Sequence, residues 1–113
     1  MATVVSLESM RRSEVSALFE GASHGGAAPI SMFVTKWPPG GGPRLHKHPY
    51  AEVFLVQVGD ALFAVDGQDT PVAAAHVVVV PAETPHRFTN AGPGELRVLS
   101  VQPSPVVVQT DLD

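Results

Sequence analysis

The sequence contains no cysteine and few charged residues. Without thiols, the 113-residue chain can form neither disulfide bonds nor thiolate metal sites. Seven Lys and Arg residues against eleven Asp and Glu residues give a net charge of −4, which excludes the basic surface that nucleic acids or anionic membranes require. No apolar run approaches the roughly 20 residues of a membrane span, and residues 1–12 do not resemble a signal peptide. We therefore expect a cytoplasmic protein whose partners are small molecules or other protein chains.

Proline and glycine, in contrast, are abundant: eleven prolines and ten glycines divide the chain into short apolar runs. Runs rich in Val, Phe and Leu that are bounded by Gly, Pro, Asn or Asp are typical of β-strands, and their regular spacing favours an antiparallel sandwich or barrel. The Asp-Gly pair within residues 66–69 favours a hairpin turn, because it tolerates a positive φ. The predicted strands are residues 30–37, 51–59, 61–67, 76–82, 86–90, 96–102 and 105–110.

Helical sequence is scarce. Residues 13–21 are the helix candidate, with Ser13 as N-cap and Gly21 as the stop. The runs at 52–58 and 76–82 are apolar on both faces, the first as far as Val56, so a second sheet or a second subunit is expected to cover the face that does not meet the core. A chain this small, with so much valine on both faces, is expected to form a homodimer.

Two of the five histidines stand one residue apart, directly after a Pro- and Gly-rich loop, and a lone carboxylate follows them. Side chains alternate between the faces of a strand, so His46, His48 and Glu52 face the same way if one strand contains all three. His86 follows a Pro-rich turn further along the chain. Three imidazoles and a carboxylate at the mouth of a small barrel would hold one divalent transition metal (Fe, Mn, Ni, Zn or Cu) and leave two positions of an octahedral ion open.

The spacing of these residues resembles the first motif of the cupin family. In this chain the motif is Gly40-x5-His46-x-His48-x3-Glu52-x6-Gly59, and every named position matches.

The family's second motif, Gly-x5-Pro-x-Gly-x2-His-x3-Asn, is matched in part. Pro81, His86 and Asn90 stand at the right spacing, whereas Ala75 and Glu83 occupy the places of the two glycines. Both departures fall in turns, so they bear on local turn geometry and not on the ligands.

The resemblance implies an all-β fold, an antiparallel jelly-roll barrel that is commonly dimeric. It divides the chain into an N-terminal segment with a short helix or arm (1–29), the cupin barrel (30–105) and a C-terminal strand or tail (106–113). It also implies that the metal ligands are His46, His48, Glu52 and His86. It does not imply a reaction, because cupins include dioxygenases, isomerases, decarboxylases, lyases, sugar-binding regulators and seed-storage proteins.

Three functions are compatible with such a site. The first is a metal-dependent enzyme acting on a small organic substrate, an oxygenase with iron or an isomerase or decarboxylase with a Lewis-acidic metal. The second is a non-catalytic module that binds a small ligand at the metal, since residues 59–81 contain no insertion long enough for a lid. A purely structural metal ranks last, because no further ligand stands at strand parity near the cluster.

Residues around the cluster form a candidate substrate pocket. Phe54 and Phe88 either fill the barrel or line an apolar pocket above the metal, and no separate general base is evident. His24 and His76 fit no ligand spacing and are expected to be ordinary surface residues. The candidate pocket residues are Arg44, Tyr50, Phe54, Phe88 and Asn90.

Overall fold

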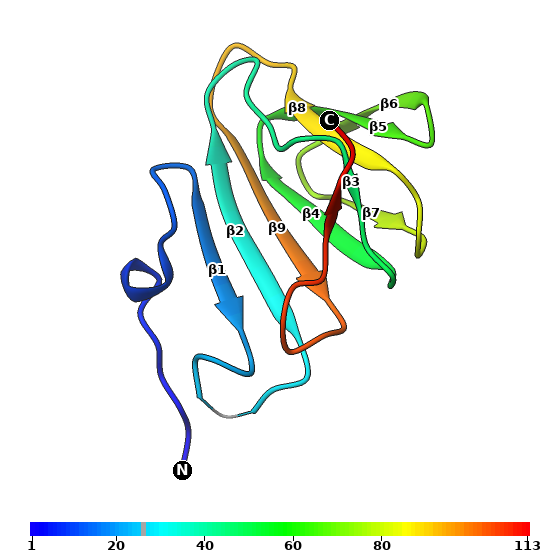
Figure 1. Cartoon of the computed structure of the whole chain (residues 1–113). Coiled ribbons are helices and arrows are strands. Elements are labelled where there is room, and N and C mark those ends of the chain that lie inside the picture. The colour runs from blue at the N-terminus through cyan, green and yellow to red at the C-terminus, as the bar shows by residue number, and fades with distance from the viewer. Residues whose placement is uncertain (26) are drawn as a thin grey trace.

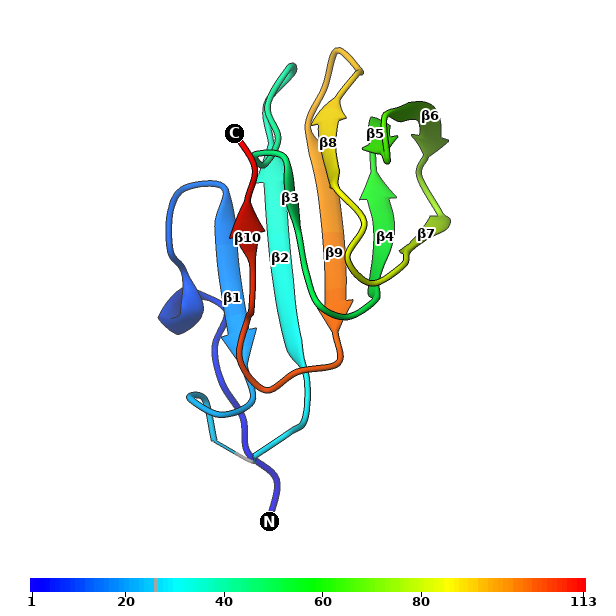
Figure 2. The same cartoon turned by 45° about the vertical axis from the view of Figure 1, so that its right-hand side comes forward.

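The protein is a sandwich of two five-stranded antiparallel sheets, as the computed structural model of residues 1–25 and 27–113 shows (Figures 1 and 2). Sheet A has the strand order β1-β2-β9-β4-β7, and sheet B has the order β10-β3-β8-β5-β6. The elements are η1 (Glu8–Met10), β1 (Ser16–Glu20), β2 (Ser31–Trp37), β3 (His46–Lys47), β4 (Glu52–Val58), β5 (Asp60–Val65), β6 (Gln68–Ala73), β7 (His76–Val80), β8 (His86–Asn90), β9 (Leu96–Gln102) and β10 (Thr110–Asp111). The predicted all-β jelly roll is therefore confirmed, in the form of a sandwich that does not close into a barrel.

Alternation of side chains builds the core between the sheets. Alternate residues of β4 from Glu52 to Val56, and alternate residues throughout β8 and β9, are buried, so each strand turns one row of apolar and polar side chains to the interior. In the described parts of the chain, no helix is long and apolar enough to cross a membrane. The core cluster comprises Phe54, Val56, Ala61, Phe63, Val72, Val80, Phe88, Leu96 and Val98.

Six of the seven predicted strands form β2, β4, β5, β7, β8 and β9, whereas the predicted strand at 105–110 is paired only at its end, in β10. The predicted hairpin turn is also confirmed. Asp66 and Gly67 have φ values of 51° and 78°, and they join β5 to β6 with Val65 opposite Gln68. Both positive φ values are those that a tight hairpin between twisted strands needs.

The helix predicted at residues 13–21 is wrong, because this segment contains β1. Ala17, Leu18 and Glu20 favour a helix locally, but β1 pairs with β2 along its whole length, from Ser16 opposite Thr35 to Glu20 opposite Ser31. Sheet pairing and burial of Leu18 outweigh the weak local preference.

The short strands β3 and β6 were not predicted. β6 contains Pro71, which is tolerated because β6 lies at the edge of sheet B.

The two turns that depart from the second cupin motif keep the conformation that glycine would adopt. Ala75 has φ 66° and Glu83 has φ 60°, both in the left-handed region. A side chain there costs roughly 1 kcal/mol or more. Glu83 is held by its N–H, which donates to the His48 carbonyl at 2.7 Å, and by an exposed ion pair with Lys47.

The loop before the histidines lies close against β8. A Cβ at Gly42 would come within 2.0 Å of the Phe88 carbonyl oxygen, so only glycine lets the two backbones approach this closely. The N–H of Gly40 donates to the Asn90 carbonyl at 2.9 Å, and the N–H of Asn90 donates to the Gly41 carbonyl at 2.8 Å. This packing fixes where the chain enters β3 and hence where His46 begins.

Candidate metal centre

The four predicted ligands form one buried cluster at the mouth of the sandwich. One ligand atom from each of His46, His48, Glu52 and His86 lies within 4.8 Å of the other three, and each residue is at most 6% exposed. Ligand atoms on opposite sides of an ion lie roughly 4.4 Å apart when each bond is about 2.2 Å long. The cluster therefore has the dimensions of a site for a single metal ion.

The reason for this convergence differs from the one the sequence suggested. No single strand contains His46, His48 and Glu52, because β3 ends at Lys47 and the chain then crosses to the other sheet. His46 lies in sheet B directly opposite His86, its register partner on β8. Glu52 starts β4 in sheet A and faces inward, so the two sheets supply ligands from opposite sides of the sandwich.

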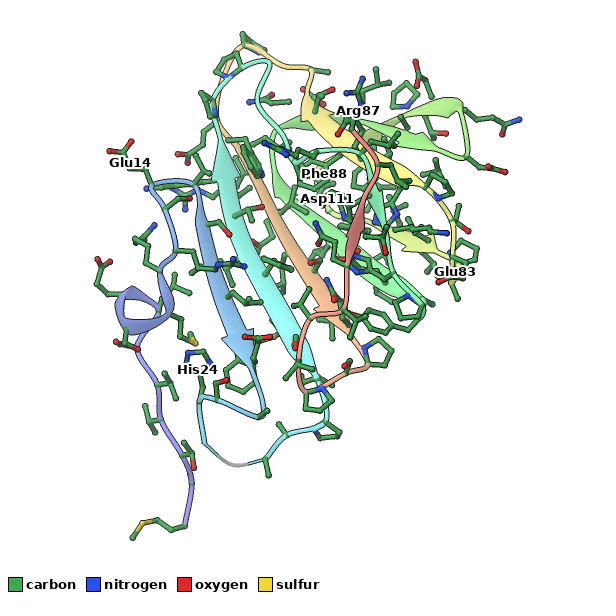
Figure 3. All side chains as sticks on the ribbon, in the orientation of Figure 1. Glu14, His24, Glu83, Arg87, Phe88 and Asp111 are labelled. Carbon is green, nitrogen blue, oxygen red and sulfur yellow. The ribbon has the colours of Figure 1, made fainter. Side chains whose placement is uncertain are left out.

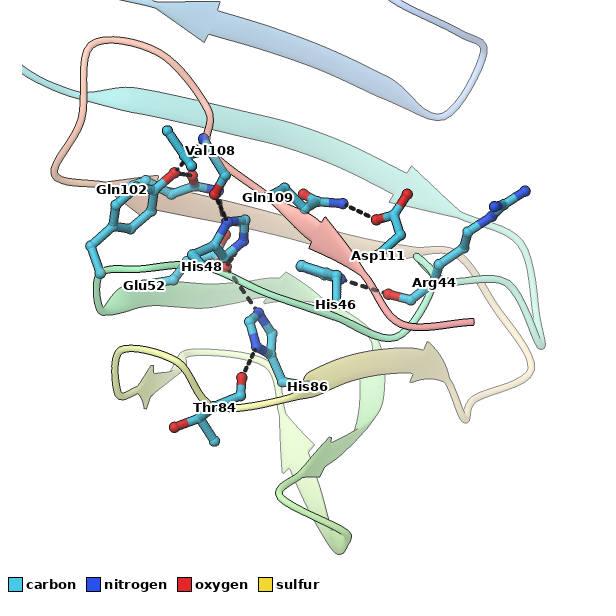
Figure 4. Close-up of polar contacts among 11 residues, drawn as sticks. Arg44, His46, His48, Glu52, Thr84, His86, Gln102, Val108, Gln109 and Asp111 are labelled. Carbon is cyan, nitrogen blue, oxygen red and sulfur yellow. Dashed lines mark hydrogen bonds and ion pairs between the residues drawn. The ribbon is translucent and has the colours of Figure 1, made fainter.

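Backbone carbonyls fix the orientation of all three imidazoles (Figure 4). A carbonyl can only accept, so each Nδ1 carries the proton, and each Nε2 of a neutral ring presents a lone pair for a metal. Such contacts to the second ring nitrogen are typical of metal-ligating histidines. The Nδ1–H groups donate from His46 to the Arg44 carbonyl at 2.6 Å, from His48 to the Val108 carbonyl at 2.8 Å and from His86 to the Thr84 carbonyl at 2.8 Å.

Within the cluster, one carboxylate oxygen faces two imidazole nitrogens, and the His86 contact has the geometry of a hydrogen bond when its Nε2 carries a proton. Oε1 of Glu52 lies 3.1 Å from Nε2 of His48 and 3.1 Å from Nε2 of His86. The His48 contact is poorly aligned for a hydrogen bond, so its buried Nε2 has no hydrogen-bond partner in the described chain. A buried carboxylate surrounded by bare imidazole nitrogens is costly unless a cation joins them. Protons or a metal ion can fill that role, and the donor set fits a divalent transition metal.

The pKa shifts follow from this geometry. Burial alone would raise the pKa of Glu52, but contacts with His48 and His86 outweigh it and lower the value to about 2. Burial opposes charge on His48 as well, yet attraction to Glu52 and the bond to Val108 raise its pKa. Burial lowers the pKa of His46. Protons and metal therefore compete for the same nitrogen lone pairs, and metal binding releases protons.

Gln102 holds the second oxygen of Glu52. Its Nε2 donates to Glu52 Oε2 at 2.9 Å, and the Tyr50 hydroxyl donates to the Gln102 carbonyl oxygen at 2.5 Å, which fixes the amide in that orientation. The N–H of Val108 donates in turn to the Tyr50 oxygen at 3.0 Å. His48 stacks on Tyr50 with ring centroids 5.3 Å apart. This network leaves Oε1 as the oxygen of Glu52 that faces the cluster.

Gln102→Met is expected to weaken metal binding about 10–100-fold, the range found when partners of metal ligands are lost. Methionine keeps the length of the fully buried side chain but removes the donor to Oε2, so Glu52 is free to rotate. Gln57→Met, the same change at an exposed position of β4, is the control. Metal affinities measured by competition with a chelator check this; equal affinities in both variants would mean that Gln102 does not position Glu52.

The remaining predicted site residues have other roles. Arg44 is exposed and its side chain points away from the cluster (Figure 4), although its carbonyl holds His46. Asn90 ties together the surrounding loops, donating to the carbonyls of Trp37 and Gly94. Figure 3 shows Phe88 between the sheets, where it packs in the core and lines a cavity together with Phe54.

The two other histidines lie outside the cluster. His76 is exposed on β7, as expected. His24 lies beyond the end of β1 and is half-buried rather than fully exposed, because its ring stacks on Phe19. Figure 3 shows that His24 is far from Phe88.

Sequence reasoning missed Gln102 and the carbonyl of Val108. A signal for Gln102 was present: it ends a strand whose alternate residues Leu96, Val98 and Ser100 face the interior, so its parity places a polar side chain inside. No signal in the sequence points to Val108, because it acts through its backbone in the C-terminal segment that pairs with β3.

A cavity of about 760 Å³ lies between the sheets and reaches the cluster at His46 and Glu52. Strands β1 and β2 extend beyond the part of sheet A that sheet B covers (Figure 1), and the cavity follows their inner face. Segments at its outer end include residues 9–13 and the side chains of Val107 and Gln109. The cluster is thus open toward a space that can admit a ligand.

Comparison with known proteins agrees with this geometry. A family model described as "Cupin domain" matches residues 33–102. A Thermotoga maritima protein called "Oxalate-binding protein" is 33% identical over 67 residues, which are 58% of this chain and 55% of that protein. The chain therefore spans about half the length of this curated relative.

Solved structures share the fold. A variant of Bacillus subtilis oxalate decarboxylase superposes with a TM-score of 0.82 at 22% identity, over 94% of this chain and 31% of that one. Oxalate oxidase in complex with glycolate gives a TM-score of 0.76 at 21% identity, over 99% and 62%. Another structure of the Bacillus subtilis decarboxylase, studied for its Mn(II) centres, gives 0.78 at 23% identity, over 89% and 29%.

Proposed function

The chain belongs to the cupin domain family, and we propose that it is a metal-dependent enzyme that binds one divalent transition metal and acts on a small organic acid coordinated to that metal. The observation that carries this proposal is the buried set of three imidazoles and one carboxylate that opens onto the cavity between the sheets. Two residues, His46 and Glu52, belong to both the cluster and the cavity wall, so a ligand in the cavity lies next to the ion.

The protein's own residues orient the site rather than transfer protons. Apart from the ligands, the titratable side chains on the described cavity wall are Arg11, Arg12, Glu20 and His24, all on or near β1. Glu20 is already engaged, since its carboxylate accepts from the Val107 N–H at 2.8 Å. A bound metal would supply Lewis-acid or oxygen chemistry, which supports a decarboxylase, isomerase or dioxygenase type of reaction over acid–base catalysis by side chains.

A non-catalytic ligand-binding module is the second candidate. The absence of an acid or base beside the cluster on the described cavity wall favours it, and one relative is named for binding oxalate rather than for converting it. Manganese is the first metal to test, because the carboxylate suits it and a structural neighbour contains Mn(II) centres.

Elemental analysis of protein purified without chelators tests the proposal. We expect one transition-metal ion per chain, and the loaded protein should bind oxalate or glycolate by calorimetry and convert a small acid in a product assay. A chain that retains none of Mn, Fe, Ni, Zn or Cu would overturn the proposal. Metal and acid binding without any turnover would establish the second candidate instead.

We also propose that the protein is a homodimer formed through the outer face of sheet A. Two rows of apolar side chains cross all five strands on this face, and three of the valines are 41%, 59% and 62% exposed (Val53, Val77 and Val79). Such a patch is typical of an interface between copies of one chain. The rows are Phe19, Met32, Val101, Val53 and Val79, and Ala17, Val34, Leu99, Leu55 and Val77.

A further inference from the structure

We infer that the acid bound at the metal carries an apolar body of aromatic size, which lies between the sheets while its chelating head reaches the ion. This inference rests on the proposed function and names its substrate class: a 2-hydroxy or 2-oxo carboxylic acid with an aryl or comparable apolar substituent. It sets this chain apart from its oxalate-handling relatives.

The size of the cavity is the first argument. Its volume of about 760 Å³ lies within the range of about 300–1,000 Å³ that holds drug-sized ligands. Oxalate, with about six non-hydrogen atoms, would leave most of that space to water. A ligand that only touches the metal end would gain nothing from the rest of the wall.

The chemistry of the wall is the second argument. Next to the cluster stand Phe54 and Phe88, edge to face with centroids 5.9 Å apart, and Trp37 contacts Phe88 in the same manner at 6.2 Å. The cationic side chains of the described wall other than the ligands, Arg11, Arg12 and His24, stand near β1. Beside the phenylalanines a second carboxylate would therefore lose its water without gaining a charged partner, whereas an aromatic ring would gain contacts with ring edges and faces. Leu18, Phe33 and Val98 continue the apolar surface along sheet A.

Small residues keep this part of the cavity open. Ser16 and Thr35 are cross-strand neighbours on β1 and β2 that face the cavity, and the Thr35 hydroxyl already donates to the Val98 carbonyl at 3.1 Å. Neither offers a charge to a second acidic group. A larger side chain at either position would fill the space assigned to the apolar body without touching the four ligands.

Lactate and 3-phenyllactate test the inference, because they share one chelating head and differ by a phenyl ring. On Mn(II)-loaded protein, calorimetry should show that phenyllactate binds at least about tenfold more tightly, as expected for burial of a ring. Thr35→Phe should remove about tenfold of the phenyllactate affinity and change lactate binding less than about twofold. Thr70→Phe, the same change at an exposed position of β6, should alter neither.

Each outcome decides between the two claims. Failure to load Mn(II) or any other transition metal, or failure to bind both acids, would overturn the proposed function. Normal metal loading with equal affinities for lactate and phenyllactate would overturn the inference alone. If Thr35→Phe does not fold, as judged by circular dichroism, Ser16→Phe serves in its place, and the ratio of the two affinities in the unmodified protein remains decisive.

Discussion

His48→Ala is expected to abolish stoichiometric metal binding, whereas His76→Ala is expected to leave it intact. His48 is 2% exposed, and its Nε2 is a buried ring nitrogen that lacks a hydrogen-bond partner in the described chain. Its ring is already oriented by the Val108 carbonyl and by stacking on Tyr50, so the free protein holds the ligand ready. Removing the imidazole takes away one of the four metal ligands. The affinity for the metal should therefore fall by more than the roughly 10–100-fold that follows the loss of a group hydrogen-bonded to a ligand.

Metal content and metal-induced stabilisation check this prediction together. A metal that binds only the folded state stabilises it by about 2.7 kcal/mol when its free concentration is 100 times Kd, so the loaded protein should melt well above the metal-free protein. The quantity to compare is this difference in melting temperature within each variant, because alanine at a buried position also destabilises the metal-free protein. Equal metal retention by the His48→Ala and His76→Ala variants would contradict the site assignment.

The ligands were predictable from the sequence because metal coordination constrains residue type and spacing together. His46, His48 and Glu52 fall at the motif positions and meet in the structure, even though the single strand assumed to align them does not exist. The spacing between His48 and Glu52 is the length of chain that crosses from sheet B to sheet A. The alternation of side chains along a single strand cannot describe such a crossing. The four residues of the cluster were therefore predicted correctly, but the single strand that was expected to align three of them was wrong.

The supporting contacts were less predictable, because they are made by backbone groups or by side chains distant in sequence. The carbonyls of Arg44, Thr84 and Val108 orient the imidazoles whatever side chains those residues bear. Gln102 reaches Glu52 across 50 residues of sequence, through the pairing of β4 with β9.

The fold shows the same division between local and non-local information. Strands with strong β-branched sequences, such as β7, were predicted within two residues of their bounds. The segment that forms β1 contains helix-forming residues, and only its partner β2 makes it a strand. β3 and β10 are two residues long; they pair with each other, and β3 also pairs with β8, and no local preference specifies these contacts.

Val79→Glu is expected to convert the dimer into a monomer without unfolding it. Val79 lies on the edge strand β7 and is 62% exposed in the single chain, so a carboxylate there remains hydrated in the monomer. In a two-fold symmetric interface each substitution occurs twice, and burying two unpaired carboxylates costs several kcal/mol. The dissociation constant of the dimer should rise at least about a hundredfold.

Sedimentation over a range of concentrations checks this expectation. The unmodified protein should have twice the 11.9 kDa of a single chain at micromolar concentrations, whereas the Val79→Glu variant should have the mass of one chain. Val106→Glu is the matched control, since Val106 is also exposed, at 42%, but lies after β9 and outside the two apolar rows. A Val79→Glu dimer as tight as the unmodified one would place the interface elsewhere, and an unmodified protein that stays monomeric at high micromolar concentration would exclude the dimer. Because the metal cluster faces the inside of the sandwich and the valines face outward, the Val79→Glu monomer should still bind one metal ion per chain.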